Sequence, residues 1–417
     1  MRQGLRIALA VGAAALAAAP AALAGQRPRP TDVPAAQVVT DVAPDELRVY
    51  NDFATPARVY RSQYAVVHYV VLGVDAPPLN DDDLDAVPDY VERVGSAADT
   101  ALAYFARRGF AAILPDTGGP DGRPDIYVSR FAPGYLGVAF PAARAQGGAF
   151  VVVSNALDPS AGRSFASLYG TVAHELFHLT QFSYFRPTVD PPIPGWALEG
   201  SAAAMEARVY PELVDTVASL QLRHWFAAPH RSLAEQTYGA QLLWRYLDER
   251  EPRVLPAYLA RLASSRPPRS AVAGLADTYG RVAGRPFRVA FGRFAAWIAD
   301  EYAERITPRA TLRPGARRRG RVSPLAIDVL RLAPATRSVT LRLSQGHDEA
   351  GLIVRLESAV AGRPPVATEL RPRVGVGGAR VYALPSALRR DAYAGTATLV
   401  VANGDASSPL VYALSVR

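Results

Sequence analysis

Residues 171–181 read TVAHELFHLTQ, a stretch without glycine or proline that predicts a helix. Residues four apart on a helix lie on one face, so His174 and His178 can offer two imidazole nitrogens to one Zn²⁺. Glu175 is rotated by about 100° from His174, which lets its carboxylate contact a water molecule on the metal without binding the metal. Each fixed letter of this H-E-x-x-H pattern therefore has a chemical role.

An alternative interpretation is a helix that carries two surface histidines. The residues around the motif contradict it, because Leu176, Phe177, Leu179 and Phe182 make the helix apolar on most sides and predict that it is buried. Burying three ionisable groups on one helix costs free energy unless they are paired or bound to a metal. The pattern therefore favours a metal site.

A catalytic zinc ion usually has three protein ligands and a water molecule. The metzincin arrangement needs a glycine and a third histidine downstream, where this chain has Gln181 and Tyr184. The better candidate for the third ligand is Glu199, in the segment WALEGSAAAME at 196–206 of a helix predicted over residues 196–208. The small residues that follow Glu199 would allow this helix to approach the first one closely.

Two other acidic residues compete for roles at the metal. Asp190, in the proline-rich loop before the second helix, is an alternative third ligand. Glu206 lies two turns beyond Glu199 on the same face, and we expect it to orient a ligand histidine. The alternative role for Glu206 is a salt bridge with Arg208 or another arginine.

Three segments together carry a family resemblance: HELFHLTQFSY at 174–184, WALEGSAAAME at 196–206, and Tyr238-Gly239 before LLWRYLDER. The pattern resembles the gluzincin type of zinc metallopeptidase, and within it secreted bacterial metalloproteases of the kind found in myxobacteria and actinobacteria. The similarity covers roughly residues 60–300. It implies zinc bound by His174, His178 and Glu199, and hydrolysis of peptide bonds in a protein or peptide substrate.

The expected reaction uses a zinc-activated water, with Glu175 as general base. The oxyanion that forms also needs a donor besides zinc, for which Tyr238, His224 and His230 are candidates. Tyr238 is favoured because a Tyr-Gly pair at a helix start could face the cleft, although a core tyrosine fits the pattern equally well. The predicted strand over residues 149–155 could pair with an extended substrate.

An acidic loop before the first long helix suggests a calcium site. Its carboxylates occupy positions 1, 3, 5, 9 and 12 of an EF-hand-like loop: Asp81, Asp83, Asp85, Asp89 and Glu92. Ala86 stands where an EF-hand needs glycine, so a looser Ca²⁺ turn with Asp81, Asp83, Asp85 and Asp89 as ligands is the expectation. The alternative is a solvated helix N-terminus, where carboxylates are favourable in any case.

The N-terminus predicts export. Residues 1–24 combine a basic start, an apolar run and a small-x-small cleavage site, which is the pattern of a signal peptide. Residues 25–45 are rich in proline and alanine and predict a flexible start or a short propeptide. The chain has no cysteine, so disulfides and thiolate ligands are excluded. We expect a secreted protein with no membrane attachment after cleavage.

The formal net charge of +8 raises the question of nucleic-acid binding. All 46 basic residues are arginine, which indicates codon bias rather than selection for a phosphate-binding surface. The only basic run, Arg317-Arg318-Arg319, is short, is flanked by glycine and proline, and has no interleaved aromatic residues. We therefore expect no nucleic-acid partner and interpret the run as part of a solvated linker.

Helices are predicted over about 164–185, 196–208, 211–226, 232–250, 254–264, 270–281 and 285–304. The order of the predicted elements, strands first and helices after, indicates an α+β fold. Residues 46–306 are expected to form a zincin-like catalytic domain, with an N-terminal mixed β-sheet followed by helices that carry the metal site. An Arg/Gly/Pro linker over 307–322 and a β-sandwich over 323–417 complete the prediction.

A second class of function stays open at this point. The chain could be an extracellular binding or adhesion protein that keeps a zincin-like fold without catalysis. The presence of Glu175 argues against this interpretation, because a protein that only binds does not need a general base.

Overall fold

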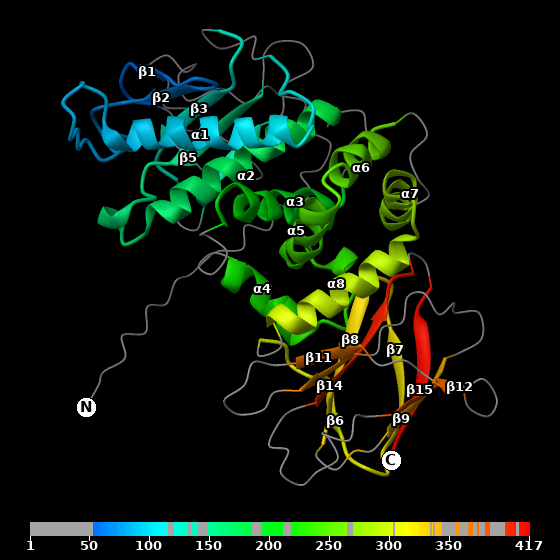
Figure 1. Cartoon of the computed structure of the whole chain (residues 1–417). Coiled ribbons are helices and arrows are strands. Elements are labelled where there is room, and N and C mark those ends of the chain that lie inside the picture. The colour runs from blue at the N-terminus through cyan, green and yellow to red at the C-terminus, as the bar shows by residue number, and fades with distance from the viewer. Residues whose placement is uncertain are drawn as a thin grey trace, which may run out of the picture. The chain divides into compact units, whose positions relative to one another are not determined.

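The computed structural model describes most of the chain after residue 52. The described ranges are 53–115, 121–131, 135–140, 149–185, 193–211, 218–264, 270–302, 305–333, 336, 338–343, 355–358, 366–369, 373–374, 380–383, 397–405 and 408–417. Within them the fold is mixed, with eight α-helices and three five-stranded sheets, which is compatible with the expected α+β class (Figure 1). The predicted signal peptide and the segment 25–45 lie outside these ranges.

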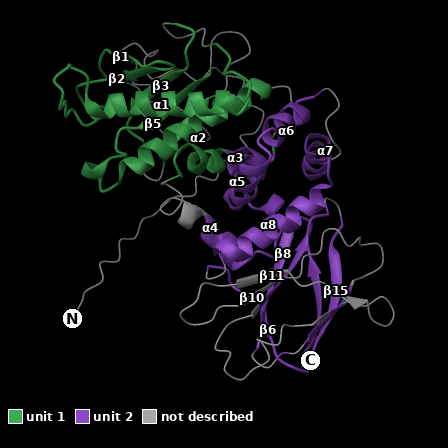
Figure 2. Ribbon diagram, in the orientation of Figure 1, with its two compact units in different colours: residues 1–193, 202–220 green, residues 194–201, 221–417 purple. Residues whose placement is uncertain are grey.

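The chain divides into two compact units. One unit comprises residues 1–193 and 202–220, and the other comprises 194–201 and 221–417 (Figure 2). In the parts of the chain that the structure describes, no helix has the length and apolarity needed to cross a membrane.

The first unit contains a mixed sheet with strand order β1-β2-β3-β5-β4. Its strands are β1 Arg58–Arg61, β2 Val66–Tyr69, β3 Asp125–Ser129, β4 Gly137–Phe140 and β5 Phe150–Ser154. Strands β2, β3 and β5 are parallel to one another, whereas β1 and β4 run antiparallel at the two edges. Every residue of the three parallel strands is buried, as expected for strands covered on both faces.

The position of β5 corrects the prediction that residues 149–155 could pair with a substrate. Strand β5 lies between β3 and β4, so its backbone groups on both sides already form sheet hydrogen bonds. In the described sheet the edge strand on this side is β4, which the sequence did not predict, because it is short and begins with a glycine.

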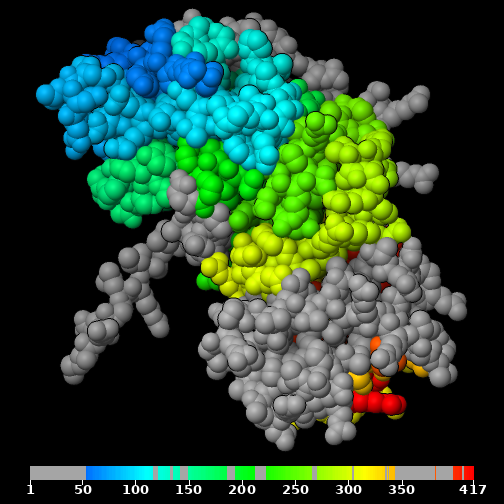
Figure 3. Space-filling model, in the orientation of Figure 1, coloured from blue at the N-terminus to red at the C-terminus, as the bar shows by residue number. Residues whose placement is uncertain are grey.

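Two long helices pack with this sheet, α1 Asp89–Arg107 and α2 Phe165–Tyr184. Helix α1 is amphipathic: it buries one face, from Tyr90 to Phe105, and its other face reaches the surface of the unit (Figure 3). Edge-to-face contacts of Phe177 with Phe105 and Phe110, at ring centroid distances of 5.1 and 5.0 Å, fix α2 beside α1.

The remaining helices match the predicted helical block. They are α3 Gly195–Val209, α4 Ala218–Ala227, α5 Gln241–Arg250, α6 Val254–Leu262, α7 Ala271–Ala283 and α8 Phe287–Tyr302. The single helix predicted over 232–250 is broken into the 3-10 turns η3 Leu233–Glu235 and η4 Tyr238–Ala240, followed by α5. Gly239 lies within η4, where a Cβ atom would come 3.1 Å from the Cβ of Trp225, so the absence of a side chain permits close packing there.

Two five-stranded sheets follow α8. One has the order β11-β10-β14-β8-β6, and its strands are β6 Ala310–Leu312, β8 Ala326–Leu332, β10 Arg355–Ser358, β11 Val366–Glu369 and β14 Ala397–Asn403. The other has the order β12-β13-β9-β15-β7, and its strands are β7 Arg317–Val322, β9 Ser338–Leu343, β12 Arg373–Val374, β13 Arg380–Ala383 and β15 Leu410–Val416. Leu330 and Leu399 of the first sheet share one buried cluster with Leu341 and Leu414 of the second.

The prediction of a solvated linker over 307–322 is wrong. Residues 310–312 form β6, and the arginine run begins β7, which pairs with β15 along its length. The period of a strand explains the error: Arg317 and Arg319 point to solvent, whereas Gly320 and Val322 are buried. Gly320 lies directly against the ring of Tyr412.

The division of the chain also differs from the predicted boundary near residue 307. Helices α5–α8 and most of α4 group with the two C-terminal sheets. Backbone hydrogen bonds join them, from the Thr307 N–H to the Phe226 carbonyl (2.9 Å) and from the Leu233 N–H to the Leu325 carbonyl (3.0 Å). Gly404 packs against the backbone of Arg288 on α8, where a Cβ atom would lie 2.8 Å from the Arg288 Cα.

Candidate metal centre

Helix α2 holds the H-E-x-x-H motif in the interior of the protein. All residues from Gly170 to Gln181 are buried, which agrees with the apolar sequence around the motif. The helix is anchored near its C-terminal end, where the Ala111 N–H donates a hydrogen bond to the Tyr184 hydroxyl at 2.8 Å. The histidines therefore project from a helix that the surrounding structure fixes in place.

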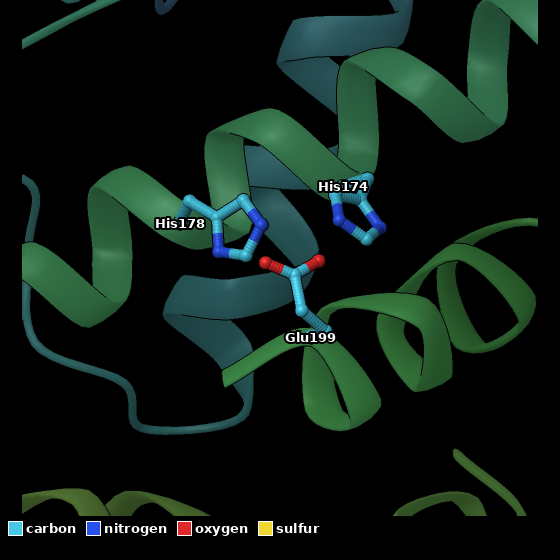
Figure 4. Close-up of side chains that lie close together, drawn as sticks. All are labelled: His174, His178 and Glu199. Atoms are coloured by element: carbon cyan, nitrogen blue, oxygen red, sulfur yellow. The ribbon is translucent and has the colours of Figure 1, made fainter. Parts of the chain in front are cut away.

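The structure brings the three predicted zinc ligands together. One potential ligand atom from each of His174, His178 and Glu199 lies within 4.8 Å of the other two. The two imidazole rings are 4.7 Å apart between centroids and nearly perpendicular. The Glu199 carboxylate of α3 points toward them (Figure 4). All three residues are buried, with exposed fractions of 8%, 5% and 4%.

Hydrogen bonds determine which imidazole nitrogen each histidine can offer to a metal. The His174 Nδ1 lies 2.6 Å from Oε1 of Glu206, and the His178 Nδ1 lies 2.7 Å from Oε1 of Gln181. Both oxygens are acceptors, so each Nδ1 carries the proton and the lone pair is on Nε2. Two neutral imidazoles and a carboxylate form a donor set that suits Zn²⁺.

These contacts also identify the roles of two neighbours. The orienting contact expected of Glu206 is present on His174. Gln181 makes the same kind of contact with His178, a role that was not predicted from the sequence. The spacing of His178 and Gln181 could have indicated this contact, because residues three apart on a helix are neighbours.

Glu199 lies in a part of α3 that is anchored by aromatic packing. Trp196 stacks on Trp244 at a ring distance of 5.3 Å, and the Trp244 Nε1–H donates to the Trp196 carbonyl at 2.9 Å. A Cβ atom on Gly200 would lie 2.9 Å from both the Thr237 carbonyl oxygen and the Ala240 Cβ. Gly200 therefore permits close packing of α3 against the η4 turn.

Glu175, the expected general base, lies outside the three-residue ligand cluster and is itself buried. Its Cγ and Oε1 face the edge strand β4 at Gly137, where a Cβ atom would lie 2.8 and 3.1 Å away from them. No motif in the sequence signals this contact of Gly137.

The three candidate oxyanion donors lie in different surroundings. Tyr238 is half-buried in η4 and directly follows Thr237, whose carbonyl packs on Gly200 beside Glu199. His224 is exposed on α4. His230 has its pKa lowered, first by burial and then by the charge of Arg309, which directly precedes β6. Of the three, Tyr238 directly adjoins a residue that packs against α3 next to Glu199.

The acidic loop forms two groups of carboxylates that share Asp83. One group consists of Asp81, Asp83 and Asp85, and the other of Asp83, Asp89 and Glu92. Ala86 has a positive φ of 73°, the left-handed conformation that glycine adopts in an EF-hand. Several of the carboxylates also accept backbone N–H bonds within the loop, including Asp81 from Ala86 at 2.9 Å.

Other acidic and histidine residues have structural partners. His68 pairs with the buried Asp125 at 3.0 Å and stacks on Tyr127, as expected for a structural histidine. Hydrogen bonds from Arg123 lower the pKa of Asp121 to about 2. Asp116, His347 and the alternative ligand Asp190 lie outside the described residues.

Comparison with protein-family models and with curated proteins finds no match to this chain. The site geometry and the sequence pattern are therefore the basis for assigning a function.

Proposed function

We propose that this chain is a zinc-dependent peptidase that holds its metal with His174, His178 and Glu199 and uses Glu175 as general base. One observation carries the proposal: two imidazoles and a carboxylate converge within 4.8 Å in the protein interior. Burial of such groups is costly unless a metal or another partner compensates for it.

The two imidazoles and the carboxylate suit Zn²⁺, and this choice of metal determines the chemistry that the site could perform. A bound Zn²⁺ would polarise a substrate carbonyl and lower the pKa of a water molecule. Glu206 and Gln181 keep the Nδ1 atoms of His174 and His178 protonated, and so direct both Nε2 lone pairs toward the site. With Glu199 included, these residues supply three ligands and leave a position for water or substrate.

Glu175 supplies proton transfer. Its carboxylate accepts a proton from the attacking water and delivers it to the leaving amine nitrogen, the usual duty of a general base that becomes a general acid. We assign the Tyr238 hydroxyl to the oxyanion that develops on the scissile carbonyl. The packing of η4 against Gly200 supports this assignment.

The edge of the N-terminal sheet offers a place for the substrate backbone. Strand β4 lies at this edge in the described sheet and directly beside Glu175. A substrate strand that pairs with β4 would bring its peptide bonds past the general base. A protein or peptide in extended conformation is therefore the substrate class we propose.

The finer fold assignments belong to the same proposal. The mixed sheet with the H-E-x-x-H helix packed against it supports a zincin-like domain of the gluzincin type. The shared core of the two C-terminal sheets supports a β-sandwich. Residues 1–24 support secretion through a signal peptide, with Gly25 as the first residue of the mature chain.

The test measures zinc content and turnover on one preparation. We expect about one zinc per chain by mass spectrometry, together with casein cleavage that a chelator abolishes and added zinc restores. Full zinc without cleavage of casein or of a proteome-derived peptide library would identify a catalytically silent binding protein instead. A chain that takes up no zinc would refute the site itself.

A further inference from the structure

The edge strand β4 approaches the general base more closely than a side chain would allow. A Cβ atom placed on Gly137 would lie 2.7 Å from the Thr171 Cγ2, 2.8 Å from the Glu175 Cγ and 3.1 Å from the Glu175 Oε1. Carbon atoms in contact prefer separations of about 3.5–4.0 Å. The space that Gly137 leaves open is therefore occupied by the side chains of Thr171 and Glu175 together.

The position of Gly137 is fixed by the sheet. Strand β4 pairs with β5 in the register Gly137↔Val153, and the Ser154 N–H donates to the Leu136 carbonyl at 2.8 Å. Strand β5 is in turn held on its other side by β3. The backbone at Gly137 thus cannot retreat from α2 without breaking sheet hydrogen bonds.

The backbone conformation does not explain this glycine. Gly137 is not among the glycines with positive φ, so an alanine could adopt the same backbone. A glycine inside a strand weakens the strand and often marks a point of close approach. What the position requires is the absence of a side chain toward Thr171 and Glu175.

The two contacted residues would respond differently to a side chain at this position. Thr171 is β-branched, and its χ1 is restricted on a helix. Glu175 has a longer side chain with more rotatable bonds, so its carboxylate would move first. The ligands His174 and His178 are held by Glu206 and Gln181 and would stay in place.

We propose that Gly137 is a positioning residue that sets the place of the Glu175 carboxylate relative to the metal ligands. The inference rests on the proposed peptidase function. Gly137 touches neither substrate nor metal in this role, and it acts only through Glu175. The H-E-x-x-H motif on α2 therefore also depends on a glycine in β4, which is a different element of the fold.

The test compares Gly137→Ala with a matched control, Gly95→Ala, in the full chain. Gly95 on α1 is equally tight, because a Cβ atom there would lie 2.6 Å from Tyr60 Cε1, but it does not contact Glu175. We expect Gly137→Ala to keep zinc near one per chain and a near-normal KM, while kcat on casein-derived peptides falls about 10²-fold, the scale for a misplaced catalytic group. Gly95→Ala should keep the wild-type kcat per zinc.

A second variant separates the two contacts. Gly137→Ala with Thr171→Ser removes the overlap with the threonine methyl group and leaves the overlap with Glu175. We expect it to fold even if Gly137→Ala does not, and kcat to stay low. A crystal structure of whichever variant folds should show the Glu175 carboxylate displaced and the three ligands unmoved.

The outcomes are distinguishable. Wild-type activity in Gly137→Ala, loss of zinc together with activity, or recovery of kcat on adding Thr171→Ser would each overturn the positioning role alone. Absence of turnover in the zinc-loaded wild type would overturn the proposed function and this inference with it.

Discussion

The Nδ1 atom of His174 on α2 donates to Oε1 of Glu206 on α3 across 2.6 Å. Glu206 lies two turns after Glu199, so one helix supplies both a candidate metal ligand and the group that orients another ligand. The equivalent contact on His178 comes from its own helix, through Gln181 at 2.7 Å. One histidine is thus supported by a carboxylate and the other by an amide.

This difference predicts unequal effects of removing the two supports. Glu206→Ala should lower zinc affinity by about 10- to 100-fold, the usual cost of losing such a partner. Gln181→Ala should lower it less, because a hydrogen bond to a charged acceptor is stronger than one to a neutral acceptor. Competition titration with a zinc-chelating dye measures both. Equal losses would contradict the ranking.

Glu199→Ala should reduce zinc occupancy as much as His174→Ala does, since loss of any one of three ligands opens the site. Asp190→Ala is the matched comparison, because Asp190 is the alternative third ligand. Metal analysis after dialysis against a weak chelator gives the occupancies. Full zinc in Glu199→Ala and lost zinc in Asp190→Ala would assign the third ligand to the loop.

Glu175→Gln separates metal binding from chemistry. Glutamine keeps the size of the side chain but cannot accept a proton from water, so zinc should stay near one per chain while turnover falls by about 10²-fold or more. Zinc content and kcat are measured on the same sample. Retained turnover at full zinc would rule out the general-base role, and loss of zinc would make Glu175 a ligand.

The acidic loop predicts a calcium effect on stability. Desolvation and then the charge of Asp85 raise the pKa of Asp83. Because the folded protein then holds this proton more tightly than the unfolded chain, the free energy of unfolding should fall as pH rises from the ordinary pKa of Asp83 through its raised value. Bound Ca²⁺ would offset the repulsion between Asp83 and Asp85, and its binding to the folded protein would raise the melting temperature.

Asp83→Asn tests this prediction, because it removes the shared carboxylate and keeps the shape of the side chain. The variant should lose the rise in melting temperature with calcium, and also the fall in stability with pH that Asp83 contributes. Calorimetry with zinc held constant checks both. Identical curves for wild type with calcium and with chelator would leave the loop as an ordinary start of α1.

The helical part of the fold could be predicted because it depends on local pattern. Helix α2 was expected over 164–185 and extends over Phe165–Tyr184, since no glycine or proline interrupts its second half. Strands β4 and β7 could not be predicted in this way. Strand β4 is four residues long, and the outward arginines of β7 hide its alternation.

In the candidate site, too, features set by local sequence could be predicted, whereas features set by tertiary packing could not. The spacing of His174 and His178 follows from the helical period alone. The approach of Glu199 depends on how two helices pack, which the sequence only suggests through small residues. The contact of Gly137 with Glu175 joins an edge strand to a helix, and no residue type signals it in advance.

Helix α2 is buried on every side from Gly170 to Gln181, and this has a consequence for how the molecule assembles. An amphipathic helix can form before its apolar face is packed, because its polar face remains in contact with water. A helix that is enclosed all round has no such face, so it becomes stable only as strands and helices close over it. The imidazoles of His174 and His178 would then acquire their fixed directions only when these elements have closed over the helix. A partly folded chain would have no assembled ligand set, so the capacity to hold metal arises together with the finished core.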